Sequence, residues 1–230
     1  MKTKKGIFFD LYDTLTKSNK NLYRNKAISC AKVCGVSPEI YASTWKSLVV
    51  KSNLGKFPQT SDRVEAVLHL LNIPRDQHII NTIVKYEHEI LRNGISLYKD
   101  AIPTLRTIRK SGLKLGLITN ASPSVHIVIE NLNLTEYFDS IVISSEVGYR
   151  KPDSRIYEIA SERLNLVPGD CIFVGDGNDQ ELDGAHKIGM VSVLIKRVQP
   201  KHVQGVNSSE SNIDFTIHSL AELPGIFVNL

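Results

Sequence analysis

Asp10 stands at the end of a short apolar run, in a position where its carboxylate could act as a nucleophile. The segment GIFFDLYDTL, residues 6–15, changes abruptly from apolar to polar at this aspartate. A carboxylate can attack phosphorus or an alkyl carbon and form a covalent intermediate, which divides one difficult step into two easier ones. A buried strand ending at Asp10 would present the side chain at the carboxyl edge of a sheet, where open α/β proteins bind their ligands.

Lys151 is a candidate for the cation that this chemistry needs. Attack by Asp10 on a phosphate dianion is opposed by charge repulsion, so a positive charge must lie close to the reacting atoms. Lys151 immediately precedes Pro152 and a helix-like segment at 154–165. Its ammonium would neutralise the nucleophile and the charge that develops in the transition state. Arg150 is the neighbouring alternative.

The segments around these residues alternate between strand and helix patterns. Apolar runs typical of buried strands lie at 6–9, 114–118, 140–144, 171–174 and 191–195, with a weaker one at 214–217. Helix-like segments lie between them at 100–111, 122–133, 154–165 and 180–188. This alternation predicts an α/β fold with a parallel sheet and helices on both of its faces.

Residues 17–96 break the alternation, because they carry helical periodicity and almost no strand signal. Ser37 followed by Pro38 is typical of an N-cap with proline in the first turn, and it predicts a helix that ends near Val50. Further helices are predicted at 24–34, 61–71 and 76–93. The pattern therefore predicts an all-helical insert between the first and second strands of the sheet.

The chain resembles the haloacid dehalogenase-like (HAD) hydrolase superfamily, whose first motif is Asp-x-Asp-x-Thr after an apolar strand. Residues 10–14 match that motif except at Tyr12, and the later motifs follow in the superfamily's order. The resemblance covers the whole chain. It implies a Rossmann-like catalytic core, residues 1–16 and 97–230, and an inserted helical cap, residues 17–96. Such a cap closes over the catalytic edge, excludes water and contacts the substrate.

The second motif of the superfamily is a strand that ends in a hydroxyl residue, here Thr119 followed by Asn120 after the apolar run 115–118. The resemblance implies that the Thr119 hydroxyl donates a hydrogen bond to an oxygen of the transferred group. It also implies that Asn120 helps to line the substrate pocket.

The fourth motif of the superfamily places one acid directly after a strand and another acid five residues later. Asp176 and Glu181 hold these positions, and Asp179 is the alternative for the second acid. The resemblance implies that both acids hold Mg²⁺ together with Asp10, a backbone carbonyl near Tyr12 and waters. Such a set of oxygen ligands suits the octahedral coordination of this ion.

Tyr12 replaces the second aspartate of the first motif. In superfamily phosphatases that aspartate protonates the leaving oxygen and then deprotonates the attacking water, a form of help typically worth about 10²–10⁴-fold. A tyrosine with its ordinary pKa of about 10 is a poor substitute at neutral pH. Asp13 is adjacent, but neighbouring side chains usually point in different directions. Three roles for Tyr12 stay open: a weak acid, an element of shape, or the cause of lost activity.

An Asp-x-Tyr first motif is similar to the 2-haloacid dehalogenase branch, whose halide leaving group needs no proton and which uses no metal. Residues 120–123 and the pair Trp45-Lys46 add to this likeness. Dehalogenases commonly have Trp-Arg at the latter place, where the arginine binds the substrate carboxylate; Lys46 lacks its planar fork. However, dehalogenases have serine in place of Asp176, and three crowded carboxylates without a cation would repel one another.

The acidic fourth motif favours a Mg²⁺-dependent phosphatase that acts on a small phosphorylated metabolite through an aspartyl-phosphate intermediate at Asp10. The first alternative is a 2-haloacid dehalogenase that uses Asp10 without metal. The second is a catalytically weak, phosphate-binding or regulatory member. Arg24 and Lys46 in the insert, with Asn120 in the core, are the candidates for contact with the substrate.

The composition is that of a globular protein without an evident nucleic-acid or membrane surface. The 230 residues are 42% hydrophobic and 23% charged, and 28 basic and 24 acidic side chains are interspersed. No apolar run reaches the roughly 18 residues of a membrane span. Cys30 and Cys34 share one helical face and Cys171 opens an apolar strand, so all three are expected to be buried. We therefore expect a cytoplasmic protein whose partner is a small molecule.

Overall fold

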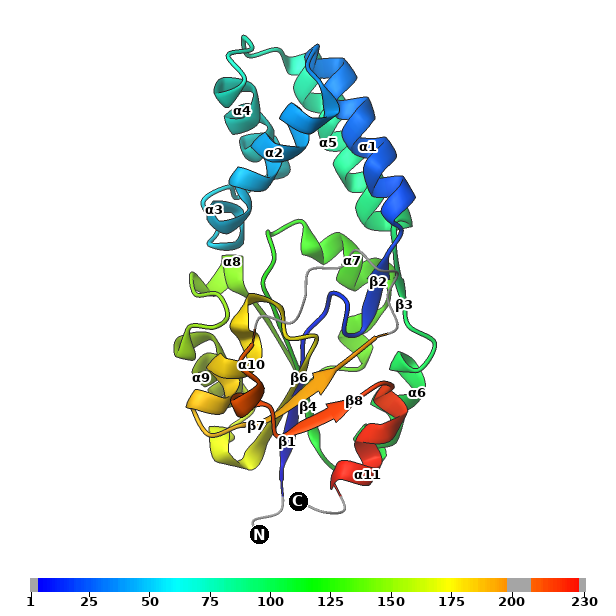
Figure 1. Cartoon of the computed structure of the whole chain (residues 1–230), viewed down its shortest axis with the longest axis vertical. Helices are drawn as coiled ribbons and strands as arrows, with labels where there is room; N and C mark the ends of the chain where they lie inside the picture. The colour runs from blue at the N-terminus through cyan, green and yellow to red at the C-terminus, as the bar shows by residue number, and fades with distance from the viewer. Residues whose placement is uncertain (1–3, 198–207, 228–230) are drawn as a thin grey trace.

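A six-stranded parallel sheet forms the core of the molecule, in a computed structural model that describes residues 4–197 and 208–227. Its strands lie in the order β5-β4-β1-β6-β7-β8, and every neighbouring pair is parallel (Figure 1). Their bounds are β1 Gly6–Phe9, β4 Lys114–Thr119, β5 Ser140–Ile143, β6 Cys171–Gly175, β7 Val191–Ile195 and β8 Phe215–Ile217. All six predicted strands are present, and β1, one of the two central strands, ends directly before Asp10.

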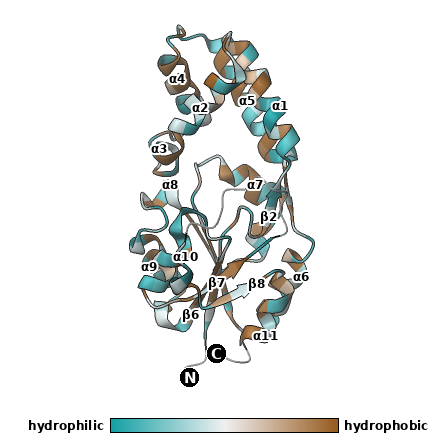
Figure 2. Ribbon diagram, viewed as in Figure 1, coloured by the Kyte–Doolittle hydropathy of each residue, from teal (hydrophilic) through white to brown (hydrophobic). Residues whose placement is uncertain are grey.

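Helices cover both faces of this sheet, as the alternating pattern predicted. Successive strand residues point to opposite faces, so Ile7 and Phe9 pack into one buried cluster and Phe8 into another. The first cluster is completed by α6 Ala101–Lys110, α7 Val125–Asn131 and α11 Leu223–Phe227. The second is completed by α9 Ser154–Arg163 and α10 Glu181–Lys187, with α8 Ser144–Val147 beside β5. The fold is therefore α/β with a Rossmann-like parallel sheet (Figure 2).

Five helices lie between the two short strands β2 Thr16–Ser18 and β3 Ile95–Leu97, which pair antiparallel. They are α1 Lys20–Cys34, α2 Pro38–Ser47, α3 Val49–Asn53, α4 Thr60–Leu70 and α5 Gln77–Asn93. We call residues 20–93 the helical insert. It has a buried cluster of its own, which includes Tyr41, Val64 and Ile83. Figure 1 shows it above the carboxyl ends of the parallel strands.

Local signals explain where most of these helices begin. Ser37 accepts a hydrogen bond from the Ile40 amide and Pro38 occupies the first turn of α2, as predicted. The predicted helix ending near Val50 is instead two helices, which meet at Leu48 (φ −93°, ψ −3°). α7 starts at Val125 rather than at residue 122, after the Pro123 turn. The pair β2–β3 was not predicted, since three residues are too short to show strand periodicity.

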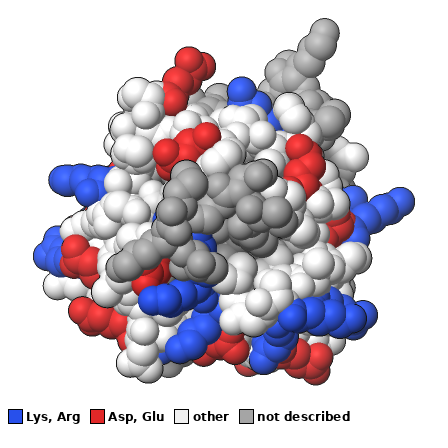
Figure 3. All heavy atoms as spheres, turned by 90° about the horizontal axis from the view of Figure 1, so that it is seen from below, with Lys and Arg blue, Asp and Glu red and all other residues white. Residues whose placement is uncertain are grey.

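Five single turns of 3₁₀ helix complete the described elements: η1 Leu134–Glu136, η2 Pro168–Asp170, η3 Asn178–Gln180, η4 Glu210–Asn212 and η5 Leu220–Glu222. Acidic and basic side chains are interspersed on the face opposite the insert (Figure 3). Cys30, Cys34 and Cys171 are all free and buried. Within residues 4–197 and 208–227, no helix is both long enough and apolar enough to cross a bilayer.

Candidate active site

Three strand ends bring the predicted catalytic residues to one edge of the sheet. Asp10 follows β1, Thr119 ends β4 on one side of it, and Asp176 follows β6 on the other. The Asp10 amide donates to the Val174 carbonyl at 2.9 Å, which continues the ladder and fixes the nucleophile's backbone. Parallel strands that end together necessarily gather the residues that follow them. The carboxyl edge therefore assembles motifs that lie far apart in the sequence.

Lys151 lies between two carboxylates and is itself buried. Its Nζ is 2.5 Å from Asp10 Oδ1 and 2.5 Å from Glu181 Oε2. Burial by itself lowers the pKa of Lys151, but the two carboxylates outweigh it and raise the pKa above its ordinary value. The ammonium is therefore permanently charged at neutral pH and lies directly against the expected nucleophile.

Glu181 is placed by two features of the segment before α10. The Gly177 amide donates to Glu181 Oε1 at 3.2 Å. A β-carbon on Gly175 would lie 2.0 Å from the same oxygen, so residue 175 must be glycine for the carboxylate to occupy this position. Burial raises the pKa of Glu181 well above its ordinary value, Lys151 lowers it and Asp10 raises it. The buried carboxylate is thus held in place by backbone and by the lysine.

Asp10, Asp176 and Glu181 form an acidic cluster whose ligand oxygens all lie within 4.8 Å of one another. Burial and then the Asp10 charge raise the pKa of Asp176 to about 7. A second cation beside Lys151 would relieve this repulsion, and carboxylate oxygens are the donors that Mg²⁺ prefers. The residues present therefore fit a magnesium ion.

Arg150 and Asp179, which the sequence offered as the alternative cation and the alternative second acid, form an ion pair with each other. Arg150 Nη2 lies 2.8 Å from Asp179 Oδ2, and Asp179 is half-exposed at the rim. Neither belongs to the acidic cluster around Asp10. The geometry therefore favours Lys151 as the cation and Glu181 as the second acid.

Thr119 and Asn120 do different things in the structure. Thr119 Oγ1 is buried, has no hydrogen-bond partner within the described residues and lies at the strand end beside Asp10, although Thr119 does not itself line the catalytic cavity. The Asn120 side chain accepts from the Lys151 amide at 2.8 Å and donates to the Lys151 carbonyl at 3.0 Å. Asn120 thus fixes the backbone that carries the buried lysine, while it also lines the catalytic cavity.

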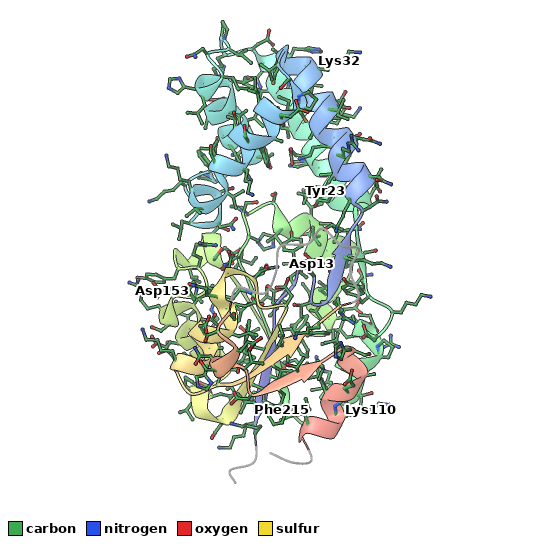
Figure 4. The ribbon with its side chains drawn as sticks, viewed as in Figure 1. Asp13, Tyr23, Lys32, Lys110, Asp153 and Phe215 are labelled. Atoms are coloured by element: carbon green, nitrogen blue, oxygen red, sulfur yellow. The ribbon has the colours of Figure 1, made fainter. Side chains whose placement is uncertain are left out.

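Tyr12 and Asp13 both line this cavity of about 120 Å³. Burial, then Tyr23 and Asp10, raise the pKa of the Tyr12 phenol above its ordinary value, so it stays protonated at neutral pH. Asp13 has φ 57°, a left-handed conformation that is uncommon outside glycine, although aspartate adopts it more readily than most residues. From the sequence, the Asp13 side chain was expected to point away from that of Tyr12, but both residues line the cavity. Figure 4 shows it at the top of the core, below Tyr23 of α1.

A second cavity, of about 260 Å³, lies between the helical insert and the loop after β4. Its charged walls are Lys26, Arg63 and Glu87, and the core side contributes residues 122–124. Arg24 and Lys46, the predicted substrate contacts, are exposed and line neither this cavity nor the catalytic one. Their neighbours Lys26 and Trp45 face inward instead.

The insert also contacts the core directly beside the catalytic residues. The Asn53 side chain donates to the Asn120 carbonyl at 3.2 Å. Gly55 lies so close to α8 that a β-carbon on it would come within 2.3 Å of the Ser145 carbonyl oxygen. These contacts place the end of α3 over the carboxyl edge of β4.

The fold and the geometry of this edge define a class of α/β enzyme in which a strand-end carboxylate, a buried lysine and an acidic cluster meet beneath a helical insert. Comparison with known proteins agrees with this class. A model of the haloacid dehalogenase-like hydrolase family matches residues 4–189. The chain therefore belongs to the HAD-like hydrolase family, as the sequence motifs indicated.

Relatives of similar length carry phosphatase names. The chain is 30% identical over 233 residues to glyceraldehyde 3-phosphate phosphatase of Methanocaldococcus jannaschii, and 98% of each chain is covered. It is 29% identical over 225 residues to a protein of the same name from Methanopyrus kandleri, with 95% of each covered. The solved 2-haloacid dehalogenase of Pseudomonas syringae pv. Tomato DC3000 has a TM-score of 0.73 at 22% identity, covering 98% of this chain and 99% of that one. That last likeness bears on the fold alone.

Proposed function

We propose that the protein is a Mg²⁺-dependent phosphatase that hydrolyses a small phosphorylated metabolite. The observation that carries this proposal is the buried cluster of Asp10, Asp176 and Glu181 around Lys151. Such a cluster suits a bound cation and a phosphoryl group, whereas displacement of a halide needs neither. The phosphatase names of the relatives support the same reaction class.

Asp10 is the proposed nucleophile. Its carboxylate attacks phosphorus, the bond from phosphorus to the ester oxygen breaks, and the leaving oxygen takes a proton. Water then attacks the same phosphorus, the bond to the carboxylate oxygen breaks, and inorganic phosphate leaves with Asp10 restored. Lys151 neutralises the nucleophile and the charge on the transferring group, and the Thr119 hydroxyl, which has no partner among the described residues, donates to one of its oxygens.

Asp10, Asp176 and Glu181 would hold the magnesium ion, together with a backbone carbonyl near Tyr12. When bound, the ion supplies charge neutralisation to the phosphoryl oxygens. The helical insert, which lies over this edge, is the proposed cap that excludes water during the reaction. A cytoplasmic location is consistent with the three free cysteines.

Asp13 is the proposed source of the proton that Tyr12 does not readily give. Both residues line the catalytic cavity, but burial raises the pKa of the Tyr12 phenol, whereas Asp13 brings a carboxyl group. Its left-handed backbone is the kind of local strain that concentrates at functional sites. Asp13 would protonate the leaving oxygen and later accept a proton from the attacking water.

A 2-haloacid dehalogenase is the second candidate, and the observation that favours it is Tyr12 within the catalytic cavity. That reaction would use Asp10 on carbon and release a halide without a proton. It predicts chloride release from 2-chloropropionate in the presence of a chelator. A phosphate-binding or regulatory role predicts that neither reaction occurs. It also predicts that the protein binds a phosphate mimic.

The deciding experiment measures phosphate release from phosphomonoesters with Mg²⁺ and with EDTA. The wild type and the exposed-surface control Glu158→Gln are expected to release phosphate with Mg²⁺, and Asp10→Asn is expected to lose it. Thermal unfolding of all three proteins checks that the loss is not one of folding. Chloride release in EDTA, without phosphate release, would replace this proposal with dehalogenase activity.

A further inference from the structure

The cavity between the helical insert and the core carries charges that the hydrolytic reaction does not use. Lys26 of α1 and Glu87 of α5 form an ion pair of 2.6 Å there, and both side chains are about one-tenth exposed. Arg63 of α4 lines the same cavity. Because Lys26 and Glu87 neutralise each other, Arg63 leaves the walls with one net positive charge.

Arg63 is held in position without a carboxylate of its own. Its guanidinium stacks on Trp45 at 3.9 Å from the ring centroid, and Nη2 donates to the Trp45 carbonyl at 2.8 Å. Nε is buried and has no hydrogen-bond partner within the described residues. Burial lowers the pKa of Arg63 to about 10, while the Glu87 charge raises it. Arg63 is partly buried, and its buried Nε lacks the hydrogen bond that an anion in the cavity could accept.

The lining chemistry favours a carboxylate as that anion. A carboxylate carries the single charge that balances the cavity, and its planar group matches a guanidinium fork. Thr60 and Ser122 add hydroxyl groups to the same walls. A second phosphate would bring close to two negative charges against one net positive charge.

This cavity adjoins the catalytic one. Ser52 lines the upper cavity, and its neighbour Asn53 donates to the carbonyl of Asn120, which lines the catalytic cavity. Asn120 is followed two residues later by Ser122, which lines the upper cavity. Two residues of extended chain span at most roughly 7 Å. The end of α3 and the loop after β4 therefore carry neighbouring residues that face one cavity or the other.

We propose that the upper cavity binds a carboxylate at the far end of the substrate, so that the enzyme prefers phosphomonoesters that also carry a carboxylate. Arg63 is the specificity residue, and Trp45 holds its guanidinium flat. The inference rests on the proposed phosphatase function, because the substrate's phosphate end must occupy the site at Asp10.

The kinetic test compares two substrates that differ at the far end, 3-phosphoglycerate with a carboxylate and glyceraldehyde 3-phosphate with an aldehyde. The wild type is expected to favour 3-phosphoglycerate in kcat/KM by roughly 10- to 100-fold. Arg63→Gln, which removes the guanidinium and keeps a polar side chain, is expected to remove that preference mainly through KM. The control Arg75→Gln changes an exposed arginine that pairs with Glu65, and it should keep the preference.

A second readout does not depend on turnover. Trp45 is the single tryptophan of the chain and forms part of the cavity wall, so its fluorescence reports occupancy. Titration with 3-phosphoglycerate is expected to change the emission of the wild type and of Arg75→Gln but not of Arg63→Gln, and inorganic phosphate is expected to leave it unchanged.

The outcomes separate the two proposals. A wild type that prefers the aldehyde, or an Arg63→Gln variant that loses both substrates and p-nitrophenyl phosphate equally, overturns the carboxylate site. If no phosphomonoester is hydrolysed, the phosphatase proposal fails. In that case the Trp45 titration alone decides: an Arg63-dependent change keeps the carboxylate site, and an unchanged emission rejects it.

Discussion

Arg197 Nη1 lies 2.7 Å from Asp100 Oδ2, and the same guanidinium donates to the Thr14 carbonyl through Nη2 at 2.6 Å. Thr14 precedes β2 and Asp100 follows β3, so one side chain joins the two chain segments through which the helical insert connects to the core. Arg197 also stacks on Tyr98 at 3.9 Å. The ion pair thus fixes the base of the insert and the loop that carries Asp13.

Arg197→Ala is expected to lower the free energy of unfolding by about 1–3 kcal/mol, because it removes a largely buried ion pair and the hydrogen bonds to Thr14. It should also raise KM by roughly 10-fold, since the insert and the Asp13 loop lose their common anchor. Urea unfolding and phosphatase kinetics measure the two effects. Arg155→Ala breaks the exposed pair with Asp153 and should change neither. Equal effects of both substitutions would contradict the anchor role.

Asp13→Asn tests the proposed acid and base. A good leaving group needs no proton, so this variant should release p-nitrophenol from p-nitrophenyl phosphate in a burst of about one equivalent. Steady-state turnover should then be slower by about 10²–10⁴-fold, because water is no longer deprotonated and the aspartyl phosphate accumulates. Rapid-quench kinetics detect the burst. Unchanged steady-state turnover would assign the proton transfers elsewhere.

Tyr12→Asp in the Asp13→Asn background supplies a matched rescue. It places an acid at the position that the superfamily's first motif uses, and partial recovery of steady-state turnover is expected. Recovery would show that Asp13→Asn slowed turnover because it removed a proton carrier, and not because it changed the shape of the loop. A double variant that folds, binds Mg²⁺ and stays inactive would contradict the assignment.

Asp176→Asn is expected to stabilise the metal-free protein while it removes Mg²⁺ binding. The pKa of Asp176 is raised from 3.8 to about 7, so the folded chain binds this proton more tightly than the unfolded chain does. Ionisation of Asp176 therefore lowers the free energy of unfolding. This cost is absent below about pH 4, grows between pH 4 and 7, and reaches its full size above pH 7. Asparagine cannot ionise, so the substitution removes this cost and should raise the free energy of unfolding at pH 8 by roughly 1–3 kcal/mol.

Thermal unfolding at pH 4 and pH 8, with EDTA and with Mg²⁺, measures these effects. The variant should unfold at a higher temperature than the wild type at pH 8 in EDTA, and the difference should vanish near pH 4. Mg²⁺ should raise the unfolding temperature of the wild type alone. A variant that still responds to Mg²⁺ would place the metal ligands elsewhere.

Much of the catalytic edge was predictable because its signals are local. Each buried strand shows a continuous apolar run, and Asp10, Thr119 and Asp176 stand where such runs end. Parallel order then brings them together without further information. Glu181 could be chosen over Asp179 by its spacing from Asp176, and the structure places its oxygens in the acidic cluster.

The insert residues were harder to predict because helical faces, and not residue types, decide which side chains point inward. Arg24 and Lys26 are two positions apart on α1 and so lie on different faces, whereas Tyr23 and Lys26, three apart, share one. Lys46 likewise differs from its inward-facing neighbour Trp45, because consecutive residues of a helix point in different directions. Glu87 and Arg63 lie on separate helices, and nothing local links them to Lys26. Asp13 escaped prediction because its direction depends on a left-handed backbone.

Gly175→Ala tests whether the position of the Glu181 carboxylate matters for both folding and catalysis. The added methyl would lie 2.0 Å from Glu181 Oε1, so the carboxylate must move away from Lys151 or the strand end must shift. We expect a loss of about 1–3 kcal/mol in the free energy of unfolding and a fall in kcat of more than roughly 10-fold. Gly169→Ala is the matched control, since no atom lies within 4 Å of its added methyl. Urea unfolding measures the change in stability, and Mg²⁺-dependent phosphate release measures the change in kcat. A Gly175→Ala enzyme with wild-type kcat would show that catalysis does not depend on the Lys151–Glu181 contact.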